Sequence, residues 1–171
     1  MTPEQAGHLS EEAFVERFGG ICEHSPWVAQ GAWGRRPFDG FDALAAAFKT
    51  TVDDAPREAQ IALVRAHPEL AGRERDELTT ESASEQSSAG LDRLSPDQAR
   101  RLRALNEAYR ERFEFPMVIA VRGLTAETII ERGEARLENT PEQELQSALR
   151  EVMMIARMRL RELVKDDREE S

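Results

Sequence analysis

The stretch Thr140-Pro141-Glu142-Gln143 carries the pattern that decides the fold class. Its threonine can cap a helix, its proline fits the first helical position, its glutamate favours the positive helix end, and its glutamine can close a capping box. The same order of residue types occurs at Thr2-Pro3-Glu4-Gln5 and at Ser95-Pro96-Asp97-Gln98. Three helix starts of this kind indicate a helical protein.

Outward from these starts, few windows show the alternation of apolar and polar residues that marks a β-strand. We expect helices over residues 3–7, 10–18, 25–33, 41–53, 56–66, 95–113, 125–138 and 141–165. A mostly polar segment covers 73–90, the other linkers are short and marked by glycine, and no internal repeat or domain boundary is visible. The sequence therefore predicts an all-α fold, an irregular bundle of about eight helices in a single domain over residues 1–171.

The chain has 171 residues, of which 40% are hydrophobic and 33% are charged, and its formal net charge is −10. This is enough apolar material for a core, and so acidic a chain is a poor partner for nucleic acid or an anionic membrane. No apolar run approaches the roughly 18 residues that span a bilayer, and the polar start MTPEQAGHLSEE is unlike a secretory signal. We therefore expect a cytoplasmic protein that binds neither nucleic acid nor membrane.

Cysteine and histidine are scarce in the chain. Cys22 is the only cysteine, and there are three histidines. This composition excludes an internal disulfide and a cysteine-based zinc site, and it makes a centre of several histidines hard to build. We expect Cys22 to be a small buried hydrophobic residue, and we expect no bound metal.

One charged residue interrupts the apolar face of the last expected helix. That face is formed, at spacings of three and four, by Leu145, Leu149, Val152, Ala156 and Leu163. Arg159 fills the gap before Leu163, and a buried guanidinium needs a partner because an unpaired buried charge is costly. Two interpretations stay open. In the first, Arg159 is structural: it forms an internal ion pair, or its stem packs in the core while its head group reaches water. In the second, Arg159 binds the carboxylate of a ligand.

His67 stands where a helix should end. It follows an apolar helical run and precedes Pro68, and proline disfavours helical geometry in the residue before it. An imidazole at a helix C-terminus lies at the negative end of the helix dipole, which favours its protonated form. A lone histidine is more often structural than catalytic, but a helix end before the turn-like segment 68–72 strengthens the case for catalysis.

The polar segment 79–90 contains no large apolar residue, so its composition favours a disordered or solvated loop. If the segment is helical instead, Ser82, Glu85 and Gln86 project on one side at spacings of three and four. They then offer a hydroxyl, a carboxylate and an amide. That set suits a small substrate rich in N–H and C=O groups.

A short apolar run, Phe115-Pro116-Met117-Val118-Ile119-Ala120-Val121, is closed by Arg122-Gly123. The run is too short for a typical helix, and we expect it to be extended. It can be a core segment, or its backbone N–H groups can line a binding site, as irregular segments often do.

These unusual segments together resemble the family of 2-oxo-4-hydroxy-4-carboxy-5-ureidoimidazoline (OHCU) decarboxylases, which catalyse the last step from urate to allantoin. The matching segments are FGGICEHSPWV (18–28), HPELAG (67–72), SASEQS (82–87) and FPMVIAVRG (115–123). The last helix, with Ile155-Ala156 and Arg159-Leu160, is also similar, so the resemblance runs from about Leu9 to Val164. Four motifs in the family's order are highly specific, although Met117 stands where many members are expected to have phenylalanine.

The resemblance implies an all-α homodimer that needs no metal and no organic cofactor. It also implies that three residues act in catalysis, namely His67, Glu85 and Arg159. The substrate-binding residues that it implies are Pro68, Ser82, Ala83, Ser84, Glu85, Gln86, Met117, Val118, Ile119, Ala120, Val121 and Arg159.

The implied reaction is the decarboxylation of OHCU to (S)-allantoin by a carboxy-lyase. The carboxylated carbon of this substrate adjoins a C=N bond of the ring, so the substrate itself supplies the electron sink that pyridoxal or thiamine otherwise provides. His67 would act on the hydroxyl of that carbon or protonate the neighbouring carbon, and the sequence leaves both roles open. Glu85 would hold the hydroxyl or the ureido N–H groups, and Arg159 would orient the substrate.

Two other functions remain as alternatives. A ureide hydrolase would act on a similar molecule, but it usually needs a metal or an activated nucleophile, and the sequence offers neither. A non-catalytic helical interaction module explains the bundle equally well. It does not explain Arg159 on an apolar face or His67 beside Pro68.

Overall fold

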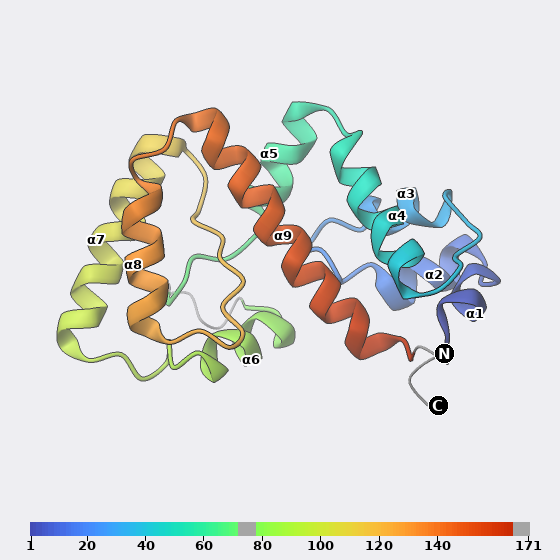
Figure 1. Ribbon diagram of the computed structural model, residues 1–171, viewed down its shortest axis with the longest axis horizontal. Coiled ribbons are helices and arrows are strands. Elements are labelled where there is room, and N and C mark those ends of the chain that lie inside the picture. The colour runs from blue at the N-terminus through green and yellow to red at the C-terminus, as the bar shows by residue number, and fades with distance from the viewer. Residues whose placement is uncertain (72–77, 166–171) are drawn as a thin grey trace. The chain divides into compact units, whose positions relative to one another are not determined.

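The computed structural model describes residues 1–71 and 78–165. In this part of the chain every regular element is a helix, and no strand is formed (Figure 1). The helices are α1 (Pro3–Gly7), α2 (Glu11–Phe18), α3 (Trp27–Trp33), α4 (Phe41–Asp53), α5 (Arg57–Arg65), α6 (Thr80–Ser88), α7 (Pro96–Phe113), α8 (Ala126–Arg136) and α9 (Pro141–Leu163). The predicted all-α fold is confirmed, and each expected helix is present with its ends within two residues of the expected ones.

The additional helix, α6, lies in the polar segment for which composition favours a loop. The hydroxyl of Thr79 caps it by accepting a hydrogen bond from the Ser82 N–H at 3.2 Å. This cap and the burial of Ser82 and Gln86 compensate for the weak helix propensity of a serine-rich sequence. The beginning of the segment, residues 73–77, lies outside the described residues, as does Gly72 of the segment 67–72.

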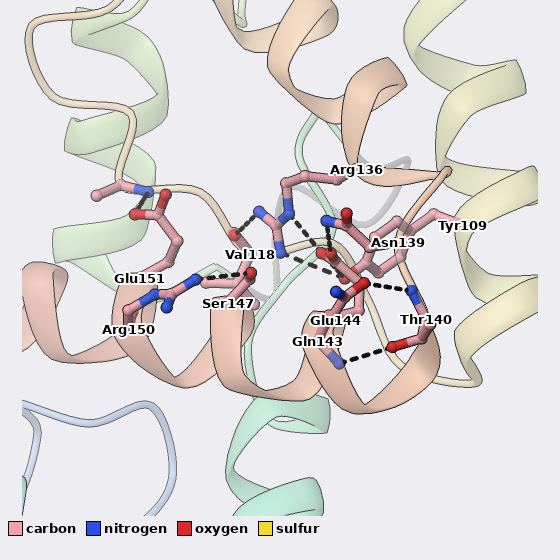
Figure 2. Close-up of polar contacts among 11 residues, drawn as sticks. Tyr109, Val118, Arg136, Asn139, Thr140, Gln143, Glu144, Ser147, Arg150 and Glu151 are labelled. Atoms are coloured by element: carbon pink, nitrogen blue, oxygen red, sulfur yellow. Dashed lines mark hydrogen bonds and ion pairs between the residues drawn. The ribbon is translucent and has the colours of Figure 1, made fainter.

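The three matching helix starts form the expected capping boxes. At α9 the Thr140 hydroxyl accepts from the Gln143 N–H at 3.2 Å, and the Gln143 side chain accepts from the Thr140 N–H at 2.9 Å (Figure 2). Helices α1 and α7 begin in the same way. Helix α3 differs, because it begins at Trp27 and has no side-chain cap. The hydroxyl of Ser25, at the expected start of this helix, donates instead to the Glu23 carbonyl at 2.8 Å.

The chain forms two compact units. The first contains residues 1–66 together with residues from 153 onward, and the second contains residues 67–152. Helix α9 therefore contributes its N-terminal part to the second unit and its C-terminal part to the first. The single domain over residues 1–171 stays a prediction.

The first unit has an aromatic core. The rings of Phe14 and Phe18 lie 4.6 Å apart between centroids, and Phe38 and Phe48 extend the cluster. Helices α3 and α4 pack closely at Gly31, where an added Cβ would lie 2.3 Å from Cγ2 of Thr51. A larger residue at this position would push the two helices apart.

In the second unit the apolar run 115–121 packs against α8. Tyr109, Phe113 and Phe115 form an aromatic cluster at the end of α7. On α8, a Cβ added at Gly133 would lie 2.6 Å from the sulfur of Met117. The absence of a side chain at Gly133 therefore allows the run to lie directly against α8.

Helix α9 has the apolar face expected from its sequence, with one shift at its end. Four of the five expected residues are buried, namely Leu145, Leu149, Val152 and Ala156. Leu163 is only half-buried, while Leu160 and Val164 are buried, because the 3.6-residue helical period drifts from a strict alternation of three and four. Among residues 1–71 and 78–165, no helix combines the length and apolar composition needed to cross a bilayer.

Candidate functional site

His67 lies directly after the C-terminal end of α5. The helix ends at Arg65, Ala66 is its C-cap, and the His67 side chain is buried, with 6% of its residue surface exposed. The helix end expected before Pro68 is thus confirmed. A buried imidazole has few rotamers open to it, and a proton donor must be held in one place to be effective.

Gln86 of α6 ties down the loop that follows His67. Its side-chain oxygen accepts from the Ala71 N–H at 3.0 Å, and its side-chain nitrogen donates to the Glu69 carbonyl at 3.4 Å. The bond to Ala71 holds that residue at a φ of 52°, a left-handed conformation that alanine rarely adopts. Both ends of the Gln86 amide therefore serve the loop, and its binding of substrate stays a prediction.

Asn106 of α7 holds the same loop and was not found from the sequence. Its side-chain nitrogen donates to the Leu70 carbonyl at 3.0 Å, and the residue is 9% exposed. The available signal was an amide residue on the buried face of α7, next to Leu105 and one turn before Tyr109. Polar residues on such a face need a partner, and here the partner is a backbone carbonyl beside the candidate site.

Helix α6 sorts the five residues 82–86 onto two faces. Ser82 and Gln86 are buried, and the Glu85 side chain is only 12% exposed. Ala83 and Ser84 are exposed. The helical interpretation is confirmed, including its placement of Ser82, Glu85 and Gln86 on one face, whereas the side chains of Ala83 and Ser84 are not brought together with them.

Glu85 also connects α6 with the end of the FPMVIAVRG segment. Its Oε1 lies 4.0 Å from Nη2 of Arg122. An ion pair of this length beside a partly exposed arginine contributes little to stability. The ion pair matters because of its position: it shows that α6 and the end of the segment 115–123 lie close together within the second unit.

The apolar run 115–121 is buried over its whole length and forms neither helix nor strand. The Val118 carbonyl and the Ala120 N–H are bonded to side chains of α8 and α9. The backbone N–H groups of Val118, Ile119 and Val121 donate to none of the residues that the structure describes. Because buried N–H groups require an acceptor, the run has donors to offer a bound molecule.

Arg159 lies in the first unit and forms an ion pair there. Its Nη2 lies 2.9 Å from Oε1 of Glu23, and its Nη1 donates to the Ile21 carbonyl at 3.3 Å. Arg159 is 3% exposed and Glu23 is 1% exposed. The interpretation of Arg159 as half of an internal ion pair is therefore confirmed, while its binding of a ligand stays a prediction.

Cys22 lies beside this ion pair. Burial raises the pKa of its thiol to about 12, and the nearby Arg159 opposes that rise only in part. The residue is 2% exposed, as expected for a small buried hydrophobic residue, and a thiol with so high a pKa is a poor nucleophile. Within the described parts of the chain, no three His, Cys, Asp or Glu side chains are grouped as ligands for a metal ion.

The predicted residues thus fall into two sets, each within one unit. His67, Pro68 and the segments 82–86 and 117–121 belong to the second unit, and Arg159 belongs to the first. The second unit contains a buried imidazole, a carboxylate on α6 and a run of buried backbone N–H groups. This set can hold a polar, planar molecule and transfer a proton to it.

Comparison with known proteins finds related sequences over most of the chain. The model of the OHCU decarboxylase family matches residues 7–161. The chain is 46% identical over 162 residues to the 2-oxo-4-hydroxy-4-carboxy-5-ureidoimidazoline decarboxylase of Haloferax volcanii, covering 95% of each chain. It is 44% identical over 153 residues to the decarboxylase of the same name from Mus musculus, covering 88% of this chain and 86% of the relative.

Two solved structures share the fold. A crystal structure of (S)-allantoin synthase superposes with a TM-score of 0.76 at 29% identity, over 96% of this chain and 54% of that one, so this chain spans about half of that protein's length. A crystal structure of OHCU decarboxylase in the presence of (S)-allantoin superposes with a TM-score of 0.71 over 91% of this chain and 98% of that one. At 22% identity, the second match concerns the fold alone.

Proposed function

Because the chain belongs to the OHCU decarboxylase family, we propose that it is a carboxy-lyase that converts 2-oxo-4-hydroxy-4-carboxy-5-ureidoimidazoline to (S)-allantoin in urate degradation. The observation that carries the proposal is the family match over residues 7–161, supported by relatives that are 44% to 46% identical along almost their whole length. The match includes every segment in which the sequence places unusual polar residues.

The proposed reaction needs positioning and proton transfer. The bond between the ring carbon and the carboxylate breaks, and its electron pair moves toward the adjoining C=N bond, whose nitrogen gains a proton. The resulting enamine-like intermediate is then protonated on the carbon that bears the ureido group, while the hydroxyl group loses its proton and becomes the carbonyl of allantoin. Such a substrate provides its own electron sink, so we expect the enzyme to need no metal and no organic cofactor.

His67 is the residue we assign to proton transfer. Its burial and the loop behind it support this role, because Gln86 and Asn106 both restrain the backbone that follows Pro68. A general acid or base must lie within hydrogen-bond reach of one atom, and such restraint favours a constant geometry. His67 acts either on the hydroxyl group or on the carbon that becomes the stereocentre.

Glu85 and the run 117–121 are the groups we assign to substrate binding, together with Pro68 and Ser82. A carboxylate can accept the ureido N–H groups, and backbone N–H groups of the run can donate to carbonyl oxygens of the ring. Arg159 would orient the substrate through an oxygen atom. A guanidinium has five N–H donors, so its pairing with Glu23 is compatible with that role.

The same proposal includes expectations about oligomeric state, location in the cell and domain organisation. We expect a homodimer, which sedimentation of the purified protein will test. We expect a cytoplasmic enzyme that binds neither nucleic acid nor membrane. We also expect a single domain, because the family match runs through both compact units and α9 contributes to both.

The test is turnover of freshly prepared OHCU by the purified protein, followed by ultraviolet absorbance with identification of the product. The proposal expects faster loss of substrate than in buffer, release of CO2 and formation of allantoin. Exhaustive treatment with a chelator should leave the rate unchanged. A rate lost on chelation and restored by one metal, with an opened ring as product, would indicate a ureide hydrolase, and no acceleration would indicate a non-catalytic module.

A further inference from the structure

Two glutamates of α9 act on the apolar run 115–121. Glu144 and Glu151 are seven residues apart, or two helical turns, so they project from the same face of the helix. Glu151 accepts a hydrogen bond from the Ala120 N–H at 3.3 Å. Glu144 acts through a third residue, Arg136 at the end of α8 (Figure 2).

Arg136 divides its guanidinium among three acceptors. Its Nε is bonded to Glu144, its Nη1 donates to the Val118 carbonyl at 2.6 Å, and its Nη2 donates to the Tyr109 hydroxyl at 3.3 Å (Figure 2). The Arg136 side chain is 12% exposed. A planar fork with three buried partners has little freedom to rotate, so the Val118 carbonyl is held at a fixed place beside α8.

Glu144 is fully buried, and hydrogen bonds compensate for its burial. Besides Arg136, the Tyr109 hydroxyl donates to it at 2.7 Å and the Asn139 side chain donates at 2.9 Å. Burial raises the pKa of Tyr109, so the phenol stays protonated and remains a donor at neutral pH. A buried polar network whose members are all bonded is rigid, so Glu144 holds the Arg136 side chain in one orientation.

Arg136 and Glu151, the two anchors of the run, bond to alternate residues of it. Val118 and Ala120 both turn a backbone polar group toward side chains of α8 and α9, as alternate residues of an extended chain do. The intervening Ile119 then directs its N–H and carbonyl to the opposite side. Neither group is bonded to any residue in the described part of the chain.

We propose that Arg136 is a positioning residue for the decarboxylation, and that Glu144 and Tyr109 hold it in place. Arg136 fixes the Val118 carbonyl and thereby orients the backbone of Ile119 toward the N–H and C=O groups of a ureide. This inference rests on the proposed function and adds to it a residue outside all the family motifs recognised in the sequence. Without the anchor the run can rotate, so the substrate binds more weakly and the planar intermediate is exposed to protonation on both faces.

The test removes the anchor without leaving a buried charge. In the double variant Arg136→Met/Glu144→Gln the guanidinium is lost, and a neutral amide still meets Tyr109 and Asn139. The matched control is Arg101→Met, because Arg101 joins α7 to α8 through Glu127 and Glu134 at 2.7 and 3.1 Å and forms no bond to the run among the residues that the structure describes. A second pair, Glu151→Leu and Glu151→Gln, removes or keeps the acceptor for the Ala120 N–H.

The measurements are KM, kcat and the enantiomeric excess of the product as it forms. The double variant should raise KM about tenfold, the size of a strong neutral hydrogen bond, and it should lower the enantiomeric excess. Glu151→Leu should raise KM about threefold, while Glu151→Gln and Arg101→Met should keep the wild-type KM and enantiomeric excess. Partial unfolding lowers the amount of active enzyme and the apparent kcat, but it leaves KM unchanged. The enantiomeric excess is compared at enzyme concentrations at which the spontaneous, racemic loss of CO2 is negligible, so that partial unfolding does not change it either.

A folded double variant with wild-type KM and enantiomeric excess would overturn the proposal. If the double variant does not fold, the Glu151 pair decides, and wild-type values for Glu151→Leu would overturn it equally. Absence of turnover in the wild-type protein is a separate outcome, because it contradicts the proposed function itself.

Discussion

The guanidinium of Arg159 lies 2.9 Å from the carboxylate of Glu23, and both side chains are almost completely buried. The two residues are 136 positions apart in the sequence, and the pair joins the end of α9 to the loop before α3. Glu23 lies in the FGGICEHSPWV segment, so this family motif supplies the partner of a residue predicted to bind substrate. Glu23 therefore fixes how Arg159 is oriented.

Replacing Arg159 by methionine should destabilise the fold strongly. The change leaves the Glu23 carboxylate buried without its guanidinium, and breaking a buried pair in this way costs about 3–5 kcal/mol. The double variant Arg159→Met/Glu23→Gln should recover much of that loss, because it removes both charges. Urea unfolding of the wild type, both single variants and the double variant measures the effect, and equal stability of Arg159→Met and wild type would contradict it.

Replacing Arg159 by lysine separates stability from function. Lysine keeps a positive charge near Glu23 but loses the planar fork that can bind two groups at once. We expect a severe loss of activity with a modest change in the free energy of unfolding. Retention of activity by a stable Arg159 variant would show that the residue serves only the ion pair.

Replacing His67 by asparagine should leave the fold near normal, because the residue lies at a helix end. Turnover should fall by about two to four orders of magnitude, the usual contribution of general acid–base catalysis. His24→Asn is a suitable control, because His24 is exposed and has a φ of 46°, a conformation that asparagine tolerates. Near-wild-type turnover by folded His67→Asn would remove this residue from the mechanism.

The buried thiol of Cys22 predicts a specific dependence of stability on pH. Its pKa is raised from 9.0 to about 12 in the folded protein, so above pH 9 the unfolded chain loses this proton more readily than the folded one. Ionisation then favours the unfolded state, and the stability that the thiol contributes falls between about pH 9 and pH 12. The difference in unfolding free energy between wild type and Cys22→Ala should shift by about 1 kcal/mol, against the wild type, from pH 9 to pH 10. A difference independent of pH would contradict the raised pKa.

Local signals predicted most of the fold. The capping boxes at α1, α7 and α9 depend on residues three apart, and they form as expected. Composition misjudged α6, because the cap at Thr79 and the burial of one face outweigh a weak helix propensity. Spacing alone still placed Ser82, Glu85 and Gln86 on one face.

The sequence could not identify side-chain partners that lie in other helices or loops. The sequence identified Arg159 as a charge in need of a partner, but nothing local pointed to Glu23, 136 residues earlier. Glu144 stands next to the apolar face of α9 and looks like an ordinary acidic residue of a first helical turn. Its role depends on Arg136 and Tyr109 from two other helices, and such pairings are created by tertiary packing.

The most direct test of the central claim is the circular dichroism of the product as it forms, before slow racemisation. The substrate can lose CO2 spontaneously, and protonation in free solution favours neither face. If one face of the intermediate meets His67, or a water that it positions, a preference of about 3 kcal/mol gives more than a hundredfold bias. The account predicts a single enantiomer, dextrorotatory (S)-allantoin, from the first seconds of turnover. Accelerated CO2 release with racemic product from the start would contradict it, because protonation would then follow release from the protein.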